Sequence, residues 1–199
     1  MLFLDEAPEF PVSVLEALRQ PLEERVIRIS RASGTLEFPA DFLLVACANP
    51  CPCGRIAREC RCNDVQRTRY ARRLSAPLLD RFDLRLRVET PAGECGEPGE
   101  SSATVRARVV AAQARQHARL AGTPWRCNAH IPAGALEHLV PLSPAARESW
   151  VDACRFRRLT GRGAARVRRV ARTLADLDDR DAITPDDVVR ASWLREDVW

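Results

Sequence analysis

The chain has 199 residues, of which 46% are hydrophobic and 29% charged, a composition typical of a soluble globular protein with one medium-sized domain or two small ones. Its formal net charge of +4 at pH 7 permits a nucleic-acid partner without requiring one. The sequence contains no lysine, which excludes a glycine-rich phosphate loop ending in Lys-Ser or Lys-Thr within these residues. Its longest apolar run is far shorter than the roughly 20 residues that span a bilayer, so we expect a cytoplasmic protein with no membrane partner.

Two apolar runs, Leu2–Leu4 and residues 42–48, predict strands of a parallel sheet that is covered on both faces. Each run is followed by polar residues: Asp5–Glu6 after the first and Asn49 after the second. Because the carboxyl ends of parallel strands share one edge, we expect these polar side chains to lie side by side. Open α/β sheets bind their ligands at this edge.

A helix and a hairpin are predicted between these two strands. Pro11 begins the helix, and Pro21 disfavours helix at the preceding residue and so ends it. Residues 27–30 and 35–38 alternate between apolar and polar side chains, which predicts two antiparallel strands joined by a short turn.

The rest of the chain is predicted to contain one more strand and then helices. Residues 84–88 alternate between apolar side chains and arginine, which indicates a strand with one exposed face. Residues 91–99 are rich in proline and glycine and have the composition of a linker. Four helices are then expected, at residues 101–120, 144–157, 164–177 and 185–194.

These elements place the chain in the α/β class. We predict a partial α/β core with a hairpin insertion at residues 1–90, a linker at residues 91–100 and an all-α domain at residues 101–199.

The eight cysteines of the chain indicate a metal site more than disulfides, because cytosolic thiols stay reduced. Cys47 lies inside an apolar run and is interpreted as a small core residue. Four others form two closely spaced Cys-x-Cys pairs, whose thiolates could hold Zn²⁺ in a tetrahedron; free reduced thiols are the alternative. These four are Cys51, Cys53, Cys60 and Cys62.

The motifs follow one another in an order that resembles a known family. An apolar strand ends in Asp-Glu, a second ends in Asn-Pro, and residues 78–83, Leu-Leu-Asp-Arg-Phe-Asp, precede an alternating segment. Together with residues 14–23, 49–54 and 171–177, they resemble the ComM/YifB-type magnesium-chelatase-like AAA+ ATPases, whose branch also includes replicative helicases. The resemblance covers nearly the whole chain and corresponds to the carboxyl-terminal half of such a protein.

This resemblance implies a truncated AAA+ core, running from the Walker B strand to the arginine-finger strand without a P-loop, followed by an all-α lid domain. Asp5 and Glu6 would be the Walker B acids, for Mg²⁺ and for activation of the attacking water. Asn49 would be the sensor-1 residue that positions this water. Arg81 would be the arginine finger that reaches the nucleotide of a neighbouring subunit.

Further arginines acquire expected roles from the same resemblance. A salt bridge to a neighbouring aspartate is the alternative for Arg81. Arg162 resembles the sensor-2 arginine of the lid, and Arg166 competes for that role. Arg28 and Arg31 lie in a hairpin that faces the central pore in helicases of this branch, which makes them candidate DNA contacts. Basic residues that protect a hairpin edge against aggregation would give the same pattern.

The resemblance also implies cofactors and partners: ATP with Mg²⁺ in a complete homo-oligomeric ring, expected to be a hexamer, and DNA. An upstream half would carry the P-loop, and the strand leading into that loop is central in AAA+ sheets. We therefore expect unpaired strand edges and no ATP hydrolysis by this chain alone, as in a truncation, a split protein or a product of a misplaced start site.

We accordingly interpret the chain as part of a competence-associated DNA helicase or branch-migration motor. A magnesium-chelatase motor subunit is the enzyme alternative. A non-hydrolysing remnant or adaptor that binds zinc and DNA is the alternative without catalysis.

Overall fold

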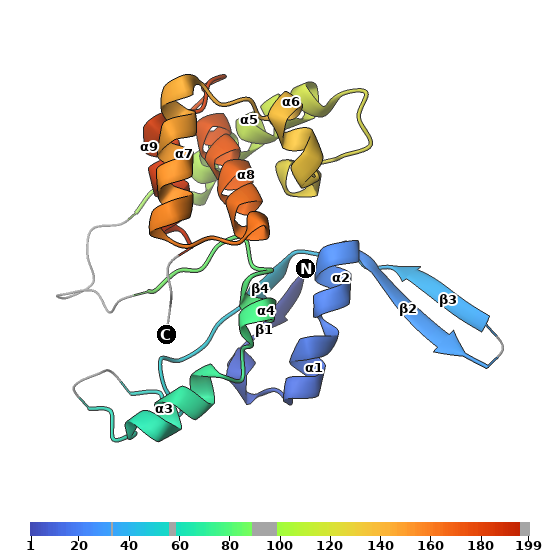
Figure 1. Ribbon diagram of the computed structural model, residues 1–199, viewed down its shortest axis with the longest axis vertical. Coiled ribbons are helices and arrows are strands. Elements are labelled where there is room, and N and C mark those ends of the chain that lie inside the picture. Colours follow the sequence, from blue (N-terminus) through green and yellow to red (C-terminus); the bar gives the residue numbers. More distant parts are fainter. Residues whose placement is uncertain (33, 56–58, 89–98, 196–199) are drawn as a thin grey trace. The chain divides into compact units, whose positions relative to one another are not determined.

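The structure is a computed structural model that describes residues 1–32, 34–55, 59–88 and 99–195. The chain divides into two compact units, of which the first is Met1–Phe82 and the second begins at Asp83. Within the described ranges the named strands lie in the first unit and the longest helices in the second, which agrees with the predicted mixed α/β class (Figure 1). None of the helices in these ranges combines the length and the hydropathy that crossing a bilayer demands.

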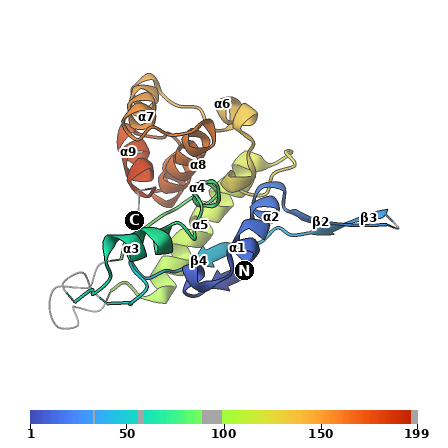
Figure 2. The same cartoon turned by 60° about the horizontal axis from the view of Figure 1, so that its bottom comes forward.

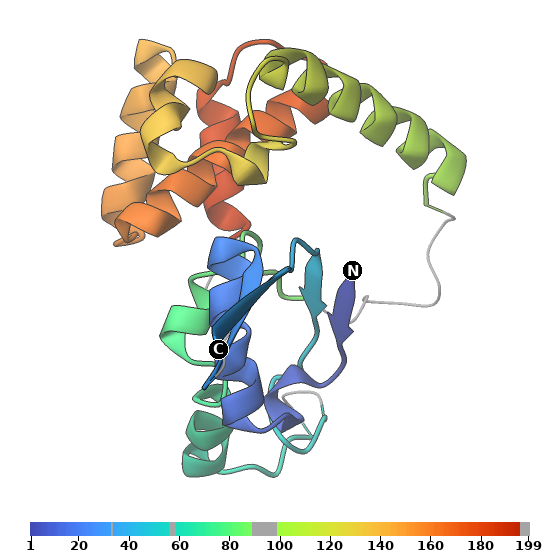
Figure 3. The ribbon, with the colours of Figure 1, turned by 90° about the vertical axis from the view of Figure 1, so that its right-hand side faces the viewer.

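The first unit consists of short elements around a two-stranded parallel sheet. β1 and β4 lie side by side (Figure 3), with Leu2 opposite Leu44 and Leu4 opposite Ala46. This pairing confirms the prediction that both strands leave the same sheet edge. In chain order the elements are β1 (Leu2–Leu4), η1 (Ala7–Glu9), α1 (Val12–Ala17), α2 (Arg19–Glu24), β2 (Val26–Arg31), β3 (Gly34–Pro39), β4 (Leu44–Ala46), α3 (Asp64–Ala71) and α4 (Ala76–Leu79).

One face of this sheet is buried and the other is exposed. On the buried face, Leu4 shares the core of the unit with Leu15 of α1 and Leu78 of α4. On the other face, Phe3 and Val45 stand opposite each other and are 55% and 39% exposed. The prediction that both faces of these strands are covered is therefore wrong for the described residues. The helices in these ranges pack against one face of the sheet only.

Pro21 does not end the first helix, contrary to the prediction. α1 ends at Ala17, and α2 begins at Arg19 and continues through Pro21 to Glu24. Pro21 is thus the third residue of a new helix, where a backbone N–H has no partner within the helix in any case. The proline ring removes no hydrogen bond at this position.

β2 and β3 form the predicted antiparallel hairpin, which extends beyond α2 as a two-stranded arm (Figure 2). Ile27 pairs with Phe38, and Ile29 pairs with Leu36. All four side chains are at least 40% exposed, so the apolar face of the arm contributes little to the core of this unit.

Residues 84–88 do not form the predicted strand. Only Arg85 makes a bridge, to Arg195, and its N–H donates to the carbonyl of Leu194 at 2.7 Å. Leu84 and Leu86 remain exposed. An alternating segment becomes a strand only beside another strand, and the described part of the second unit offers none.

The second unit is a helical domain. Of the four predicted helices, three are confirmed to within one residue at each end, and the third begins at Gly161 instead of residue 164 because the Thr160 hydroxyl accepts a hydrogen bond from the N–H of Gly163. The elements are α5 (Ser102–Leu120), η2 (Asn128–His130), η3 (Ala133–Ala135), α6 (Leu136–Leu139), α7 (Pro144–Phe156), α8 (Gly161–Leu177) and α9 (Pro185–Trp193).

α8 forms the centre of this domain. Its residues Val167, Ala171 and Ala175 are fully buried, and they share one core with Val188 and Ala191 of α9. Small side chains at a spacing of four residues let neighbouring helices approach α8 closely, because each lies on the same side of the helix.

The start of α9 is fixed by a buried carboxylate. Asp187 is fully buried and accepts hydrogen bonds from the N–H and the hydroxyl of Thr184 and from two guanidinium nitrogens of Arg180, at 2.6 to 2.9 Å. Burial by itself would raise the pKa of Asp187, but the bonds from Arg180 and Thr184 outweigh it and lower that pKa to about 2.

We predict that Asp187→Asn destabilises the second unit by about 2–3 kcal/mol, because Arg180 and Thr184 lose the charged acceptor that they share. The measurement is urea unfolding followed by tryptophan fluorescence, since Trp125, Trp150 and Trp193 all lie in this unit.

Asp186→Asn is the matched control, because Asp186 lies in the same first turn but is exposed. The folded pKa of Asp187 is depressed from the ordinary 3.8 to about 2, so its contribution is fully present above pH 4 and is lost as the pH falls towards 2. The gap in stability between the native chain and Asp187→Asn should shrink over that pH range. A gap that does not narrow would contradict the assignment.

Candidate functional site

The ends of β1 and β4 are joined by backbone hydrogen bonds that continue beyond the strands. The N–H of Cys47 donates to the carbonyl of Leu4 at 2.9 Å, and the N–H of Ala7 donates to the carbonyl of Cys47 at 2.8 Å. Asp5 and Glu6 lie between these two bonds and are both exposed. The structure therefore presents two adjacent carboxylates at the carboxyl edge of the sheet.

The two carboxylates are held differently. The Asp5 carboxylate accepts the thiol of Cys47 at 2.9 Å and the N–H of Glu6 at 3.0 Å. Glu6 has left-handed backbone angles, φ 49° and ψ 47°, which cost a non-glycine residue about 1 kcal/mol or more. Exposed carboxylates in such a turn can bind a hard divalent cation through oxygen or accept a proton from water.

Cys47 is part of this edge and not of the core, which corrects the prediction. It is exposed, because it continues the alternation that places Val45 on the open face of the sheet. Its hydrogen bond to the Asp5 carboxylate raises the pKa of the thiol, so Cys47 stays protonated and acts as a donor to Asp5.

Asn49 follows Cys47 by two residues and is half-buried. The hydroxyl of Tyr70, in α3, accepts the backbone N–H of Asn49, and Tyr70 is 5% exposed. Gly54 approaches the side chain of Asn49: a Cβ at Gly54 would lie 3.7 Å from Asn49 Nδ2, and its φ of +67° is one that glycine adopts without strain. The position of Asn49 is thus fixed by α3 and by the loop that follows it.

That loop contains the predicted cysteine cluster. Its four sulfur atoms all lie within 4.8 Å of one another. Cys51 Sγ is 3.2 Å from Cys53 Sγ and 3.3 Å from Cys60 Sγ, and Cys53 Sγ is 3.7 Å from Cys60 Sγ. Zn–S bonds of about 2.3 Å in a tetrahedron place sulfur atoms about 3.8 Å apart, so Cys51, Cys53, Cys60 and Cys62 need only small shifts to fit.

The electrostatics of the loop favour a thiolate at one of these positions. Backbone N–H donation from Arg55, together with the thiol of Cys51, lowers the pKa of Cys53 to about 6. Desolvation by burial raises the pKa of Cys51. Since metal ligands bind as thiolates, a bound cation would have to deprotonate the remaining thiols.

α3 begins directly after the cluster. Asn63, next to Cys62, caps the helix: its side chain accepts the N–H of Gln66 at 2.8 Å, and the Gln66 side chain accepts the N–H of Asn63 at 3.0 Å. Tyr70, four residues after Gln66, accepts the backbone N–H of Asn49. The cluster, α3 and the end of β4 therefore form one continuous assembly.

Arg81 is held inside the first unit. Its side chain is 9% exposed and forms an ion pair with Glu23. It also donates to the carbonyl oxygens of Pro77, at 2.6 Å, and Arg19, at 3.2 Å. The salt bridge considered as the alternative therefore exists, but its partner is Glu23 of α2 and not a neighbouring aspartate.

The two candidate sensor-2 residues differ in their surroundings. Arg162 lies in the first turn of α8 and is exposed. Arg166, one turn later, is 14% exposed and forms an ion pair with Asp83 at 2.5 Å within the same unit. A nucleotide phosphate would therefore compete with a carboxylate for Arg166.

The hairpin arginines also differ. Arg28 pairs with Glu24 and, at 2.9 Å, with Glu37, and hydrogen bonding to Glu37 raises the pKa of Arg28. Arg31, at the end of β2, is exposed and has no ion pair within the described residues.

Sequence reasoning missed the connections made by Tyr70 and Cys47. Tyr70 is the only tyrosine of the chain, and it lies among arginines in a segment otherwise rich in charge. A lone aromatic residue in such a helix was the available signal that one side of α3 is buried.

Known families match both parts of the chain. The sequence profile for magnesium chelatase, subunit ChlI, matches residues 1–95, and the profile for the carboxyl-terminal part of the same subunit matches residues 99–195.

Curated relatives match most of the chain as well. YifB of Escherichia coli is 40% identical over 190 residues, which cover 92% of this chain and 37% of YifB. The competence protein ComM of Haemophilus influenzae is 41% identical over 188 residues, which cover 92% of this chain and 36% of ComM. The chain thus spans well under half of the length of these relatives.

We predict that Tyr70→Phe loosens the Asn49 segment without unfolding the unit. The backbone N–H of Asn49 loses its acceptor, a loss of about 1 kcal/mol that corresponds to roughly fivefold faster amide exchange at Asn49. The measurement is hydrogen exchange of peptides that cover the end of β4.

The control is the β2–β3 hairpin, whose exchange should be unchanged because Tyr70 binds Asn49, which lies outside the hairpin. Equal exchange at Asn49 in both proteins would mean that the Tyr70 hydroxyl does not hold this segment.

Proposed function

Because the chain belongs to the magnesium chelatase family, subunit ChlI, we propose that it carries the hydrolytic part of a ring-forming AAA+ ATPase that acts on DNA. One observation supports this proposal above the others. The parallel pairing of β1 with β4 brings Asp5, Glu6 and Asn49 to the same edge of a sheet. ATP hydrolysis requires a carboxylate for Mg²⁺, a base for water and a polar group that orients this water.

We assign one role to each of these side chains. Asp5 holds the Mg²⁺ of the substrate, which neutralises charge on the phosphates. Glu6 accepts a proton from the attacking water, and Asn49 orients that water through its amide. Because these 199 residues contain no lysine, the lysine that grips the phosphates is supplied by a segment outside them.

The arginines assigned to the nucleotide act after assembly. Arg81 serves as the finger towards a neighbouring subunit, and for this it must exchange Glu23 for a phosphate. Arg162 and Arg166 both remain sensor-2 candidates, and Arg166 would have to exchange Asp83 for a phosphate. The homo-oligomeric ring, expected to be a hexamer, is part of this proposal, as is DNA as its substrate.

We further propose that the cysteine cluster binds one structural Zn²⁺. The fit rests on the mutual distances of the four sulfur atoms and on the chemistry of an all-thiolate set, which favours zinc over magnesium or calcium. With all four positions taken by protein, the ion has no open site for catalysis.

Two other functions remain as alternatives. The family description favours a magnesium-chelatase motor, in which the same hydrolysis drives metal insertion into a porphyrin. The cysteine cluster favours an adaptor that binds zinc and DNA without hydrolysis. Stimulation of ATP hydrolysis by DNA, but not by porphyrin, supports the first proposal over both.

The catalytic assignment is tested in a chimera, in which this chain replaces the matching 188 residues of Haemophilus influenzae ComM and the rest of ComM provides the missing segments. We expect Glu6→Gln in the chimera to lower kcat at least about a hundredfold while ATP binding persists, because only proton transfer is lost.

Glu9→Gln is the matched control: Glu9 lies one turn later and forms only an exposed ion pair with Arg73, which contributes little. Unchanged hydrolysis by Glu6→Gln, or hydrolysis by the 199-residue chain alone, would refute the assignment.

The metal proposal predicts about one zinc per purified chain by elemental analysis, with loss of the metal in Cys53→Ser and in Cys60→Ser. Cys47→Ser removes an exposed thiol four residues before the cluster and should keep the zinc. A native chain that contains no zinc after purification in a zinc-supplied medium would leave the cluster as free thiols.

A further inference from the structure

The segment that contains the cysteine cluster and α3 is the most basic part of the first unit. Residues 51–75 include seven arginines and two acidic residues, a larger positive excess than the +4 of the whole protein. The rest of the first unit, residues 1–50 and 76–82, has five arginines and nine acidic residues and is therefore acidic. A concentrated charge of this kind attracts polyanions far more than the net charge indicates.

The described part of the first unit leaves four of these arginines without acidic partners, whereas Arg67 and Arg73 pair with Asp64 and Glu9. Arg19, Arg25, Arg28, Arg73 and Arg81 each have a carboxylate within 4.0 Å. Five others make no ion pair or side-chain hydrogen bond within the described residues, and all but one of them lie in the basic segment. They are Arg31, Arg55, Arg61, Arg69 and Arg72.

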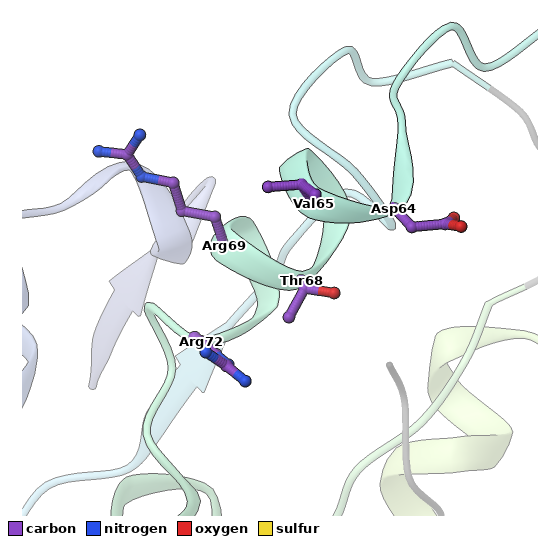
Figure 4. Close-up of a pocket in the computed structure, with 5 residues that line it drawn as sticks. All are labelled: Asp64, Val65, Thr68, Arg69 and Arg72. Atoms are coloured by element: carbon purple, nitrogen blue, oxygen red, sulfur yellow. The ribbon is translucent and has the colours of Figure 1, made fainter.

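α3 presents part of this charge on one side. Tyr70 faces the interior, and the opposite side of the helix carries Val65, Thr68, Arg69 and Arg72, which line a shallow hollow together with Asp64. Figure 4 shows these side chains leaving successive positions of α3, with the carboxylate of Asp64 pointing away from both guanidinium groups. All five residues are exposed.

We infer that this outward side of α3, with Arg69 and Arg72 at its centre, binds the sugar-phosphate backbone of a nucleic acid. Guanidinium groups bind phosphate oxygens in a bidentate manner, and the Thr68 hydroxyl adds a donor beside them. The inference deepens the proposed action on DNA and rests on it, since it names the surface that holds the strand.

An acidic membrane surface is the other polyanion to consider, and α3 does not suit it. A helix that lies in a bilayer interface needs a continuous apolar face opposite its charged face. The side of α3 opposite the arginines is occupied by Tyr70, which is buried against the protein, and Val65 is the only large apolar side chain that the helix exposes.

A metal ion at the cysteine cluster would make this surface rigid before a ligand arrives. Cys62 directly precedes the capping residue Asn63, so a metal ion held by the cluster would fix the first turn of α3. Pre-organised arginines lose less conformational entropy on binding than arginines on a mobile segment.

The test compares the native chain with Arg69→Ala/Arg72→Ala in fluorescence anisotropy with labelled 20-nucleotide single-stranded and duplex DNA. The matched control is Arg106→Ala/Arg126→Ala, which removes two exposed arginines that also lack ion pairs in the described residues. We expect the α3 variant to bind duplex roughly tenfold more weakly at 50 mM salt. The slope of log K against log salt should be less steep by about 1.8, because two phosphate contacts are lost.

Circular dichroism and zinc content verify that the α3 variant is folded, which we expect because neither side chain has a partner to lose among the residues that the structure describes. Native-like DNA binding by the α3 variant, an equal loss in the control variant, or no binding by the native chain overturns the inference. So does loss of binding to vesicles of anionic lipid without loss of binding to DNA.

The proposed ATPase is tested separately by DNA-free hydrolysis in the ComM chimera. Loss of DNA binding with normal DNA-free hydrolysis supports the inference, whereas a hydrolytically inactive chimera that still binds DNA through α3 refutes the motor and leaves the surface standing.

Discussion

The parallel register of β1 and β4 determines where the candidate catalytic groups of the first unit lie. Backbone hydrogen bonds continue this register past both strands, from Cys47 to Leu4 and from Ala7 to Cys47. As a result, Asp5 and Glu6 lie beside the segment that leads to Asn49. A slip of one residue would exchange the two faces of the strand and expose Leu4, so the buried face of the sheet protects the geometry of the edge.

The second constraint is the assembly that follows β4. The cysteine cluster, the cap of α3 and the hydroxyl of Tyr70 form a closed path that returns to the backbone of Asn49. Under the two proposals one helix would serve two purposes: its inner side would position Asn49, and its outer side would present arginines to phosphate. A metal ion at the cluster would therefore affect both ATP hydrolysis and nucleic-acid binding, because both would depend on where α3 begins.

The charged groups of the two units illustrate how the fold assigns arginines to different tasks. In the second unit, Asp176 accepts hydrogen bonds from Arg119, Arg172 and Asn128 in the interior, so these arginines serve the stability of the domain. Arg81 is likewise satisfied by Glu23 and by backbone carbonyls. Arginines without such partners, as on α3, keep their binding capacity for a ligand.

The sequence by itself determined the local elements: the hairpin from its alternation, three helices from their caps and apolar spacing, and the cysteine set from its pairs. These depend on interactions between residues close in the chain, which a pattern records. Only the tertiary structure decided that one sheet face is open, that residues 84–88 are not a strand, that Cys47 contacts Asp5, and which arginines are already neutralised. Each of these depends on which distant residues meet, and burial and ion pairing arise from that meeting and not from the order of residues.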